Sequence, residues 1–512
     1  MEGQDTKDEK EEEKILIRGV NWIGDAVMTL PAIRAIRKYY PQAHISLLVN
    51  PAVAPLFENS NDIDEIIVYE PVFRELVGKL RLAKILRKKR FSRAILLQNA
   101  FDAALIAFLA RIPKRIGYNR DRRGVLLTDP IRYTNQDRNV HHIHYYLNLL
   151  TAAGIGAAYS HPWLRMTLQE RLDARARLSE LKRPILGINP GATFGSSKRW
   201  LPERFAEVAG WFIRETRGSV VILGGKDDVT TGEEIYKQIP MNKLLLAGKT
   251  SLRELMALVS ECDVLVTNDS GPMHIAYAVG TPLAAIFGST SPELTGPVGE
   301  GYAVIRTKID CSPCFERTCH KDYIKCMFGI KSEDVYANII RLLPAKRAVF
   351  FDRDGTLCRD ANYLNRWEDF ELLSGVDRLK SLREEGFELI GVSNQSGIAK
   401  GIIEKDFVED VNKLFIDTYG FTDFYYCPHN PEDFCQCRKP EPEMLLRARA
   451  DYGIDLKRSF VVGDKDADML LAKAVGARGI LVRTGLKNKS AHADAVVDDL
   501  DNAIKYILKW KE

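Results

Sequence analysis

Short apolar runs and longer amphipathic stretches alternate along almost the whole chain, and this alternation predicts its fold class. The stretches between the runs have the spacing of helices that bury one face. Strands that alternate with helices form α/β structures in which most strands are parallel. We therefore expect α/β architecture, with strands at Ile15–Ile17, Ile45–Val49, Ala94–Leu97, Ile185–Ile188, Val220–Leu223, Val264–Thr267 and Leu283–Phe287.

The strand–helix series starts afresh at two places, which predicts three units. One new start is near Pro184, after the charged helical stretch Gln169–Lys182, and the other is at Ala348. A chain of 512 residues is also too long for a single core. We expect doubly wound units at residues 14–180, 181–343 and 346–512, preceded by a disordered acidic tail at residues 1–13.

Composition and charge limit the classes of partner. Hydrophobic residues make up 46% of the chain and charged residues 28%, as in ordinary globular proteins, and the net charge of +4 is too small to indicate a nucleic-acid partner. No apolar run reaches membrane-spanning length, and the N-terminus lacks the apolar core of a signal peptide. We expect a cytoplasmic protein with no nucleic-acid partner, and peripheral contact with the inner membrane stays open.

Seven of the nine cysteines fall into two clusters, which in a cytoplasmic protein favours metal over disulfides. The later cluster reads C-x-H-x5-C-x-C and offers four soft ligands, a set typical of a closed, structural zinc site. Such a zinc ion would fix the loop that carries Arg438 and Lys439. The ligands are Cys427, His429, Cys435 and Cys437.

The earlier cysteine cluster has a less diagnostic spacing, C-x2-C-x4-C-x6-C, with His320 inside it. Zinc binding and buried free thiols are both compatible with this pattern. Its cysteines are Cys311, Cys314, Cys319 and Cys326.

A strand near residue 348 ends in two carboxylates, in the segment AVFFDRDGTL. Asp352 and Asp354 are two residues apart, and Gly355 allows a turn whose amides can face an anion. One carboxylate can attack phosphorus while the other protonates the leaving oxygen. Such an acidic pair can also lie on a solvated loop, so the assignment of a phosphatase depends on the later segments.

Three later segments supply groups that suit a phosphoryl ligand. The strand Glu388–Val392 ends in SNQSG, with a hydroxyl and amides, and CRKP supplies positive charge. The strand Ser459–Val462 ends in Gly463-Asp464-Lys465. Ligands of open parallel sheets bind at such strand ends.

The order of these four segments resembles the haloacid dehalogenase superfamily, whose phosphatases share DxDGTL. The resemblance covers the whole C-terminal unit. It implies that Asp352 is the nucleophile and Asp354 the general acid, which also activates the water. It further implies that Asp352, Asp464 and the carbonyl of Asp354 hold Mg²⁺, and that Ser393 and Lys439 bind the phosphoryl group.

Within the superfamily, the loop YYCPHNPEDFCQCRKP resembles heptose bisphosphate phosphatases and histidinol phosphatases. The segments SNQSGIAKG and CRKPEPEM resemble the heptose enzymes more closely. The resemblance implies that Ser393, Asn394, Arg438 and Lys439 contact the substrate, heptose 1,7-bisphosphate, which loses its 7-phosphate. The chain departs from the pattern at Glu443, where a glycine is expected.

The N-terminal units contain two glycine-rich strand–turn–helix segments. In ILIRGVNWIGDAVMTLPA, Asp25 stands near the start of a helix, where a carboxylate could act chemically or only cap the helix. In ILGINPGATFGSSKRW, a loop rich in small residues precedes Lys198 and could hold a diphosphate. A further strand ends in Asn268-Asp269-Ser270-Gly271, before a helix with His274.

Together NWIGDAVMTLPA, PGATFGSSKRW and NDSGPMHIAYAVGTP resemble the heptosyltransferases of glycosyltransferase family 9, especially the heptosyltransferase II branch. The resemblance spans residues 14–343 and implies a GT-B fold, with an acceptor-side domain and a domain for ADP-heptose. It implies Asp25 as general base and Lys198 as the group that stabilises the leaving diphosphate, with inversion and no metal. Donor-site residues would be Thr193, Asp269, Ser270, Gly271 and His274, and Glu233 or Glu234 would contact the ribose.

Two clusters of polar residues could be ordinary solvated surface or could bind a ligand. Basic residues at 111–123 and 87–93 are either solvated faces or a surface for phosphorylated sugars and anionic headgroups. The histidines of His141–His144 could suggest metal, but no partner spacing supports it. The basic residues of the first cluster are Arg111, Lys114, Arg115, Arg120, Arg122 and Arg123.

Both resemblances together imply a bifunctional enzyme of lipopolysaccharide inner-core assembly. One end would transfer heptose from ADP-heptose to a heptosyl-Kdo-lipid A acceptor, and the other would dephosphorylate heptose bisphosphate. The alternatives are a histidinol-phosphate-type phosphatase fused to another family 9 transferase, or a phosphatase tethered by a non-catalytic binding module.

Overall fold

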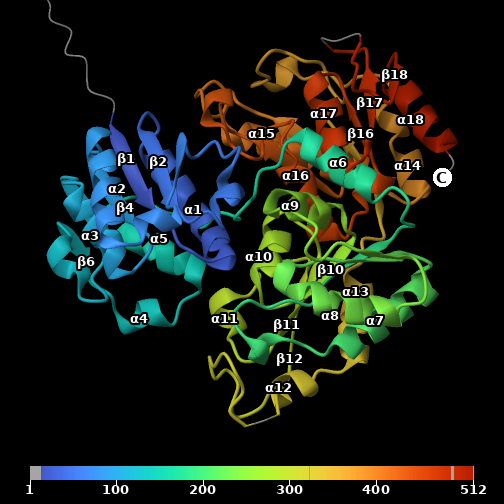
Figure 1. The fold of residues 1–512 in the computed structure, drawn as a ribbon. Coiled ribbons are helices and arrows are strands. Elements are labelled where there is room, and N and C mark those ends of the chain that lie inside the picture. Colours follow the sequence, from blue (N-terminus) through green and yellow to red (C-terminus); the bar gives the residue numbers. More distant parts are fainter. Residues whose placement is uncertain (1–12, 322, 486–488, 511–512) are drawn as a thin grey trace, which may run out of the picture. The chain divides into compact units, whose positions relative to one another are not determined.

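Across the residues that the structure describes, three six-stranded sheets form the framework of the chain (Figure 1). The structure is a computed structural model that describes residues 13–321, 323–485 and 489–510. The acidic tail predicted at residues 1–13 therefore lies outside the described residues, apart from Glu13. The central strand pairings of each sheet are parallel, which confirms the predicted α/β class.

The first sheet has the order β3-β2-β1-β4-β5-β6. Its central strand is almost fully buried, because the aliphatic run Ile15–Ile17 packs between helices. The strands are β1 (Lys14–Arg18), β2 (His44–Val49), β3 (Glu65–Val68), β4 (Arg93–Leu96), β5 (Lys114–Tyr118) and β6 (Asp129–Ile131). The helices are α1 (Ile23–Tyr39), α2 (Leu76–Lys88), α3 (Phe101–Leu109), α4 (Asn135–Arg138) and α5 (His142–Ala152).

The second sheet has the order β12-β11-β10-β7-β8-β9. The strands are β7 (Ile185–Asn189), β8 (Ser219–Ile222), β9 (Lys243–Leu245), β10 (Val264–Asn268), β11 (Leu283–Phe287) and β12 (Tyr302–Arg306). The helices are α7 (Pro202–Thr216), α8 (Val229–Gln238), α9 (Leu252–Glu261), α10 (Gly271–Ala278), α11 (Pro292–Thr295), α12 (Lys325–Phe328) and α13 (Ser332–Leu342).

The third sheet has the order β15-β14-β13-β16-β17-β18. The strands are β13 (Arg347–Phe351), β14 (Phe387–Asn394), β15 (Asp423–Cys427), β16 (Phe460–Gly463), β17 (Arg478–Val482) and β18 (Ala495–Val497). The helices are α14 (Lys380–Glu384), α15 (Lys405–Tyr419), α16 (Glu443–Tyr452), α17 (Asp466–Val475) and α18 (Leu500–Lys509).

All three sheets repeat one doubly wound strand order, in which the first and fourth strands of each series are neighbours. At that point the chain turns from one half of the sheet to the other, and the loops after the two strands part to leave a crevice. The pairs are β1 with β4, β7 with β10, and β13 with β16. The topology alone therefore marks the carboxyl ends of these strands as binding positions.

The chain divides into two compact units that do not follow the sequence in a single cut. The first contains residues Met1–Thr167, Leu178–Val298 and Val304–Tyr336, and the second contains the rest. The helix α6 (Leu168–Arg177) belongs to the second unit, where Arg175 donates a hydrogen bond to the carbonyl of Lys473 on α17 at 3.2 Å. The predicted boundaries at 14–180, 181–343 and 346–512 stay predictions.

Among the described residues, no helix combines the length and the apolar character that a membrane crossing requires.

Candidate active sites

The third sheet places two aspartates at its topological turning point. Asp352 follows β13 and Asp464 follows β16, and both side chains are buried. The ammonium group of Lys439 lies 2.7 Å from Oδ1 of Asp352 and 2.6 Å from Oδ1 of Asp468. It also donates a hydrogen bond to the carbonyl of Val392 at 2.9 Å. One buried cation thus joins the ends of β13 and β14 and the start of α17.

Charge balance keeps Lys439 protonated in this buried place. Burial alone lowers the pKa of a lysine, but the carboxylates of Asp352 and Asp468 outweigh it and raise the pKa of Lys439. Removal of one carboxylate would leave the cation short of a partner, which is costly in a low-dielectric interior. Lys439 is therefore positioned as a fixed positive charge next to the expected nucleophile.

Three carboxylates at this edge fit a divalent cation. Oxygen atoms of Asp352, Asp464 and Asp468 lie within 4.8 Å of one another, and all three residues are buried. Carboxylate oxygens are the ligands that Mg²⁺ prefers. Gly355 has a φ of +92°, and a Cβ there would lie 2.7 Å from Asp464, so only glycine leaves room for this carboxylate. Asp468 was not predicted, although it lies four residues after Asp464.

Asp354 accepts hydrogen bonds from two side chains to which the sequence motifs assigned no role. The guanidinium of Arg353 donates to both carboxylate oxygens of Asp354, each at 3.2 Å, and Nε2 of Gln395 donates to Oδ2 at 2.7 Å. Arg353 is fully buried. The only sequence signal for Arg353 was its position between Asp352 and Asp354.

The end of β14 supplies the groups expected to meet a phosphoryl oxygen. Ser393 is buried, and its hydroxyl accepts a hydrogen bond from Gln395 at 2.6 Å. The side chain of Asn394 accepts from the backbone N–H of Lys439 at 3.0 Å and donates to its carbonyl at 3.3 Å. Asn394, predicted as a substrate contact, therefore positions the backbone of Lys439.

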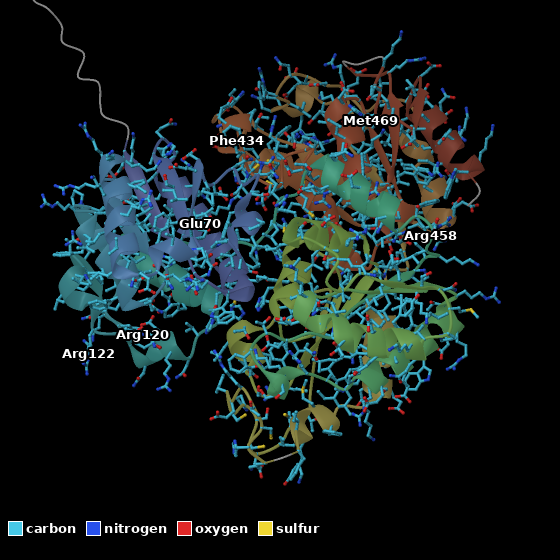
Figure 2. The ribbon with its side chains drawn as sticks, in the orientation of Figure 1. Glu70, Arg120, Arg122, Phe434, Arg458 and Met469 are labelled. Carbon is cyan, nitrogen blue, oxygen red and sulfur yellow. The ribbon has the colours of Figure 1, made fainter. Side chains whose placement is uncertain are left out.

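The later cysteine cluster closes into a compact set at the end of β15. Four neighbouring pairs of ligand atoms, drawn from Cys427, His429, Cys435 and Cys437, are 3.3–3.6 Å apart. In a tetrahedron with metal–sulfur bonds of about 2.3 Å, adjacent ligand atoms are about 3.8 Å apart. The cluster therefore has the size and ligand chemistry of a closed zinc site. Phe434 projects from the same loop (Figure 2).

The zinc-type cluster and the cationic residues of the loop are adjacent in sequence and in space. Cys437 directly precedes Arg438 and Lys439, and Arg438 donates to the carbonyl of His429 at 3.4 Å. A metal at this cluster would therefore fix the start of the segment that carries both cations.

The earlier cysteine cluster is looser. Its four cysteines line one surface cavity together with His320, and burial, followed by the neighbouring thiols, raises the pKa of Cys326. In the described part of the chain, the two groups that bring metal-ligating atoms within 4.8 Å are the Asp352 trio and the Cys427 cluster. Cys311 and Cys314 are exposed, so the alternative of buried free thiols is wrong for these two, and zinc at this cluster stays a prediction.

A second candidate site is built in the first unit around Asp25. Asp25 stands in the first turn of α1, and its Oδ1 lies 3.5 Å from Nδ1 of His142 on α5. The neighbouring Gly24 packs against His274, where a Cβ would lie 2.6 Å from the imidazole ring. Glycine at this position thus allows α1 to approach His274 closely.

The buried His274 stands among charged groups of this site. Burial lowers the pKa of His274 to about 4, although the carboxylates of Asp269 and Asp25 act in the opposite direction. Because that pKa lies well below neutrality, the imidazole is uncharged at neutral pH.

Lys198 and Asp269 form a buried ion pair with 2.5 Å between Nζ and Oδ2. The hydroxyl of Thr290, after β11, donates to the same carboxylate at 2.5 Å. The pair joins the loop after β7 to the end of β10, so the structure brings together the two segments that the motifs singled out. Thr290 was not predicted.

The remaining predicted donor-site residues lie on the same loops. Thr193 is exposed on the loop after β7. Ser270 and Gly271 begin α10, and the Ser270 hydroxyl lies 3.2 Å from that of Thr267. Glu233 and Glu234 are exposed on α8, and the carboxylate of Asp228, just before α8, lies against Gly191.

Of the basic residues at 111–123, Arg123 fits neither a solvated face nor a surface for anions. Arg123 is fully buried and donates to backbone carbonyls of Tyr118 and Gln98, because it closes the turn between β5 and β6. Arg115 is half-buried, with its guanidinium over the ring of Phe108. Arg120 and Arg122 remain at the edge of this part of the chain (Figure 2).

The three histidines at residues 141–144 have separate partners. His141 contacts the carbonyl of Gly296 at 2.9 Å, His142 faces Asp25, and the ring of His144 stacks with Tyr159.

Two family models match separate parts of the chain. A model described as glycosyltransferase family 9 (heptosyltransferase) matches residues 79–325, and one described as HAD-hydrolase-like matches residues 436–503.

Characterised relatives cover the same two parts almost completely. Lipopolysaccharide heptosyltransferase 2 of Salmonella typhimurium is 34% identical over 308 residues, which are 57% of this chain and 88% of the relative. D-glycero-beta-D-manno-heptose-1,7-bisphosphate 7-phosphatase of Vibrio cholerae is 39% identical over 185 residues, which are 33% of this chain and 100% of the relative. The solved structure of E. coli ADP-heptose lps heptosyltransferase II matches with a TM-score of 0.57 and 31% identity, over 64% of this chain and 98% of that one.

Loss of one ligand from the Cys427 cluster tests the zinc assignment. In Cys435→Ser, zinc measured by mass spectrometry in the purified protein is expected to fall by about one atom per chain, because a closed site needs all four ligands. The second unit is also expected to unfold at a lower temperature. Cys262→Ser, at a buried thiol outside both clusters, is the control. Unchanged zinc content in Cys435→Ser contradicts the assignment.

Proposed function

Because the chain belongs to glycosyltransferase family 9 in its N-terminal part and to the haloacid dehalogenase-type heptose bisphosphate phosphatases in its C-terminal part, we propose that it is a bifunctional enzyme of lipopolysaccharide inner-core assembly. Both resemblances drawn from the sequence motifs are confirmed, as is the combination of a GT-B-like fold with a phosphatase domain. The observation that carries the proposal is the near-complete coverage of two separate enzymes by one chain, each with its expected carboxylates at a sheet turning point.

The phosphatase reaction is proposed to proceed in two displacements at Asp352. An oxygen of Asp352 attacks phosphorus, the phosphorus–oxygen bond to the sugar breaks, and Asp354 gives its proton to the leaving oxygen. Water then loses a proton to Asp354 and attacks the aspartyl-phosphate, which releases phosphate and restores Asp352. The hydrogen bonds from Arg353 and Gln395 support this role, since they orient Asp354 for both proton transfers.

Mg²⁺ would be held by Asp352, Asp464 and the carbonyl of Asp354, and it would neutralise phosphoryl oxygens when bound. Lys439 adds a second fixed positive charge beside the nucleophile. Its pairing with Asp468 supports a role for Asp468 in orienting Lys439, not in contacting substrate.

The proposed phosphatase substrate is heptose 1,7-bisphosphate, cleaved at the 7-phosphate. The relatives of this part carry that substrate in their names, which favours it over histidinol phosphate. Ser393 and Lys439 are assigned to the transferred phosphate, and Arg438 to the remaining one. Structural zinc at the Cys427 cluster would keep Arg438 in reach of the substrate. Glu443 is the first residue of α16, so it occupies a helix start where a carboxylate is favourable.

The transferase reaction is proposed to use Asp25 as general base. Asp25 takes the proton of the acceptor hydroxyl, whose oxygen attacks the anomeric carbon of ADP-heptose as the bond to the diphosphate breaks, with inversion. Lys198 would turn from Asp269 to the leaving diphosphate, since the pair already lies in the loop region that can bind phosphates. The neutral His274 supplies a hydrogen-bonding group without adding charge.

The acceptor and the location complete the proposal. The acceptor is a heptosylated Kdo-lipid A, in line with the heptosyltransferase 2 relatives. Because that acceptor is a lipid, the enzyme would work at the cytoplasmic face of the inner membrane, in peripheral contact with it. The two reactions are separated by nucleotide activation of the sugar, so the fusion fixes their stoichiometry and implies no direct transfer between sites.

Single substitutions should separate the two activities. Asp352→Asn is expected to abolish phosphate release from heptose bisphosphate and to leave heptose transfer from ADP-heptose unchanged, because each site has its own carboxylates. Asp25→Asn is expected to do the reverse. Both activities are measured on the same full-length preparations. Phosphate release that survives Asp352→Asn, or transfer that survives Asp25→Asn, would falsify the corresponding role.

Arg353 is expected to act as a positioning residue for Asp354. In Arg353→Met, kcat for heptose bisphosphate should fall by about 10- to 100-fold with little change in KM, because a misplaced acid slows proton transfer. In single turnovers, the loss of rate in the first displacement should be smaller for an aryl phosphate, whose leaving group needs less protonation than a sugar hydroxyl. Arg353→Lys should not restore activity, since lysine cannot form both hydrogen bonds.

The control for this variant is Arg378→Met, which removes an exposed arginine paired with Asp501 in the same unit. An equal loss for both substrates in Arg353→Met would indicate a purely structural effect and sink the positioning role.

A further inference from the structure

The solvent-facing side of α2 carries aliphatic residues that a helix facing only water would normally lack. Its inner side is buried through Gly78, Leu82, Ala83 and Leu86, as expected for a helix that packs on a sheet. Yet the outer side also carries aliphatic residues, with Leu76 65% exposed, Val77 79% and Leu80 50%. A helix of a water-exposed surface normally places polar residues there.

A neighbouring turn extends this apolar surface. The 3₁₀ turn η2 (Pro71–Phe73) packs on the start of α2, where a Cβ at Gly78 would lie 2.0 Å from the carbonyl oxygen of Val72. Glycine at residue 78 therefore allows the turn to lie against the helix. Val72 is itself 59% exposed. The exposed aliphatic residues thus form one group on adjoining elements.

Cations alternate with the aliphatic residues on the same outer side. At 100° per residue, Arg81, Lys84, Arg87 and Lys88 fall within the half-turn that also contains Leu76, Val77, Leu80 and Ile85. All four cations are exposed, and α2 contains no acidic residue. The one cation of α2 toward the sheet side, Lys79, is paired with Asp102 at 2.7 Å.

Apolar side chains interleaved with cations fit one kind of partner. A bilayer with anionic headgroups accepts aliphatic side chains below the headgroups while Lys and Arg stay at the level of the phosphates. A soluble phosphorylated sugar would satisfy the cations but leave the aliphatic residues in water. A protein partner would need matching acidic and apolar groups, whereas an anionic membrane presents both everywhere.

We propose that the outer face of α2, together with Val72, is the surface by which this enzyme docks on an anionic lipid bilayer. The face consists of Val72, Leu76, Val77, Leu80, Arg81, Lys84, Ile85, Arg87 and Lys88. The reason why the enzyme would dock on a membrane rests on the proposed function, in which the acceptor is a lipid. The docking itself does not depend on catalysis. The basic residues at 111–123 are not part of this face.

The test uses the full-length protein and sedimentation with vesicles of phosphatidylglycerol or of phosphatidylcholine. Wild type is expected to bind the anionic vesicles and to be released as salt rises, because charge attraction is screened. The triple variant Leu76→Ser/Val77→Ser/Leu80→Ser and the charge variant Lys84→Glu/Lys88→Glu should each bind at least about tenfold more weakly.

Matched controls separate this surface from general effects. Met241→Ser removes one exposed apolar side chain elsewhere, and Lys237→Glu reverses one charge on α8, so both should bind vesicles like wild type. Heptose transfer to a delipidated, water-soluble acceptor should be unchanged in all four variants. A wild type that docks but transfers no heptose would refute the proposed function and leave the docking surface intact.

Three results would overturn the proposal. One is vesicle binding by the triple and charge variants that equals that of wild type. Another is equal binding of wild type to phosphatidylcholine and phosphatidylglycerol. The third is a wild-type dimer that becomes monomeric in the triple variant while vesicle binding persists, since α2 would then join two copies of the chain.

Discussion

The buried ammonium group of Lys439 is the point on which the phosphatase site depends. It contacts carboxylates that follow β13 and begin α17, and a carbonyl within β14, so three separate elements meet at one charge. A buried ion pair repays the cost of desolvation only when its geometry and hydrogen bonds are complete. The ammonium group of Lys439 meets this condition, because its three N–H donors face Asp352, Asp468 and the carbonyl of Val392. Asn394 also holds the lysine backbone through both its N–H and its carbonyl. The zinc-type cluster then restrains the chain just before it.

The sequence predicted the positions of the candidate catalytic aspartates better than the contacts that hold them in place. Aspartates at the ends of aliphatic runs are visible in one dimension, because strand ends of a doubly wound sheet converge. Asp352, Asp464 and Asp269 were found on that basis together with family motifs, whereas Asp25, in the first turn of α1, was found from its motif. The sequence did not show why residue 24 is glycine. The structure does: the ring of His274, some 250 positions later, leaves no room for a side chain there.

Residues that act through packing were missed for a physical reason. The contacts of Gln395 and Asp468 depend on side-chain directions that no local spacing encodes. Arg123 shows the converse error: in sequence it belongs to a run of basic residues, yet its guanidinium satisfies carbonyls inside the fold. Charge counts along a sequence cannot separate exposed basic residues from buried ones, because burial is a property of the folded structure.

The placement of α6 has a consequence for how the two enzymes can ever be separated. Its residues lie between the two sheets of the transferase in sequence, yet the helix is part of the phosphatase unit and bonds to α17. A cut near residue 343 would therefore remove from α17 a helix that packs on it in this chain. The helix α6 therefore ties a segment that lies within the transferase sequence to the phosphatase unit.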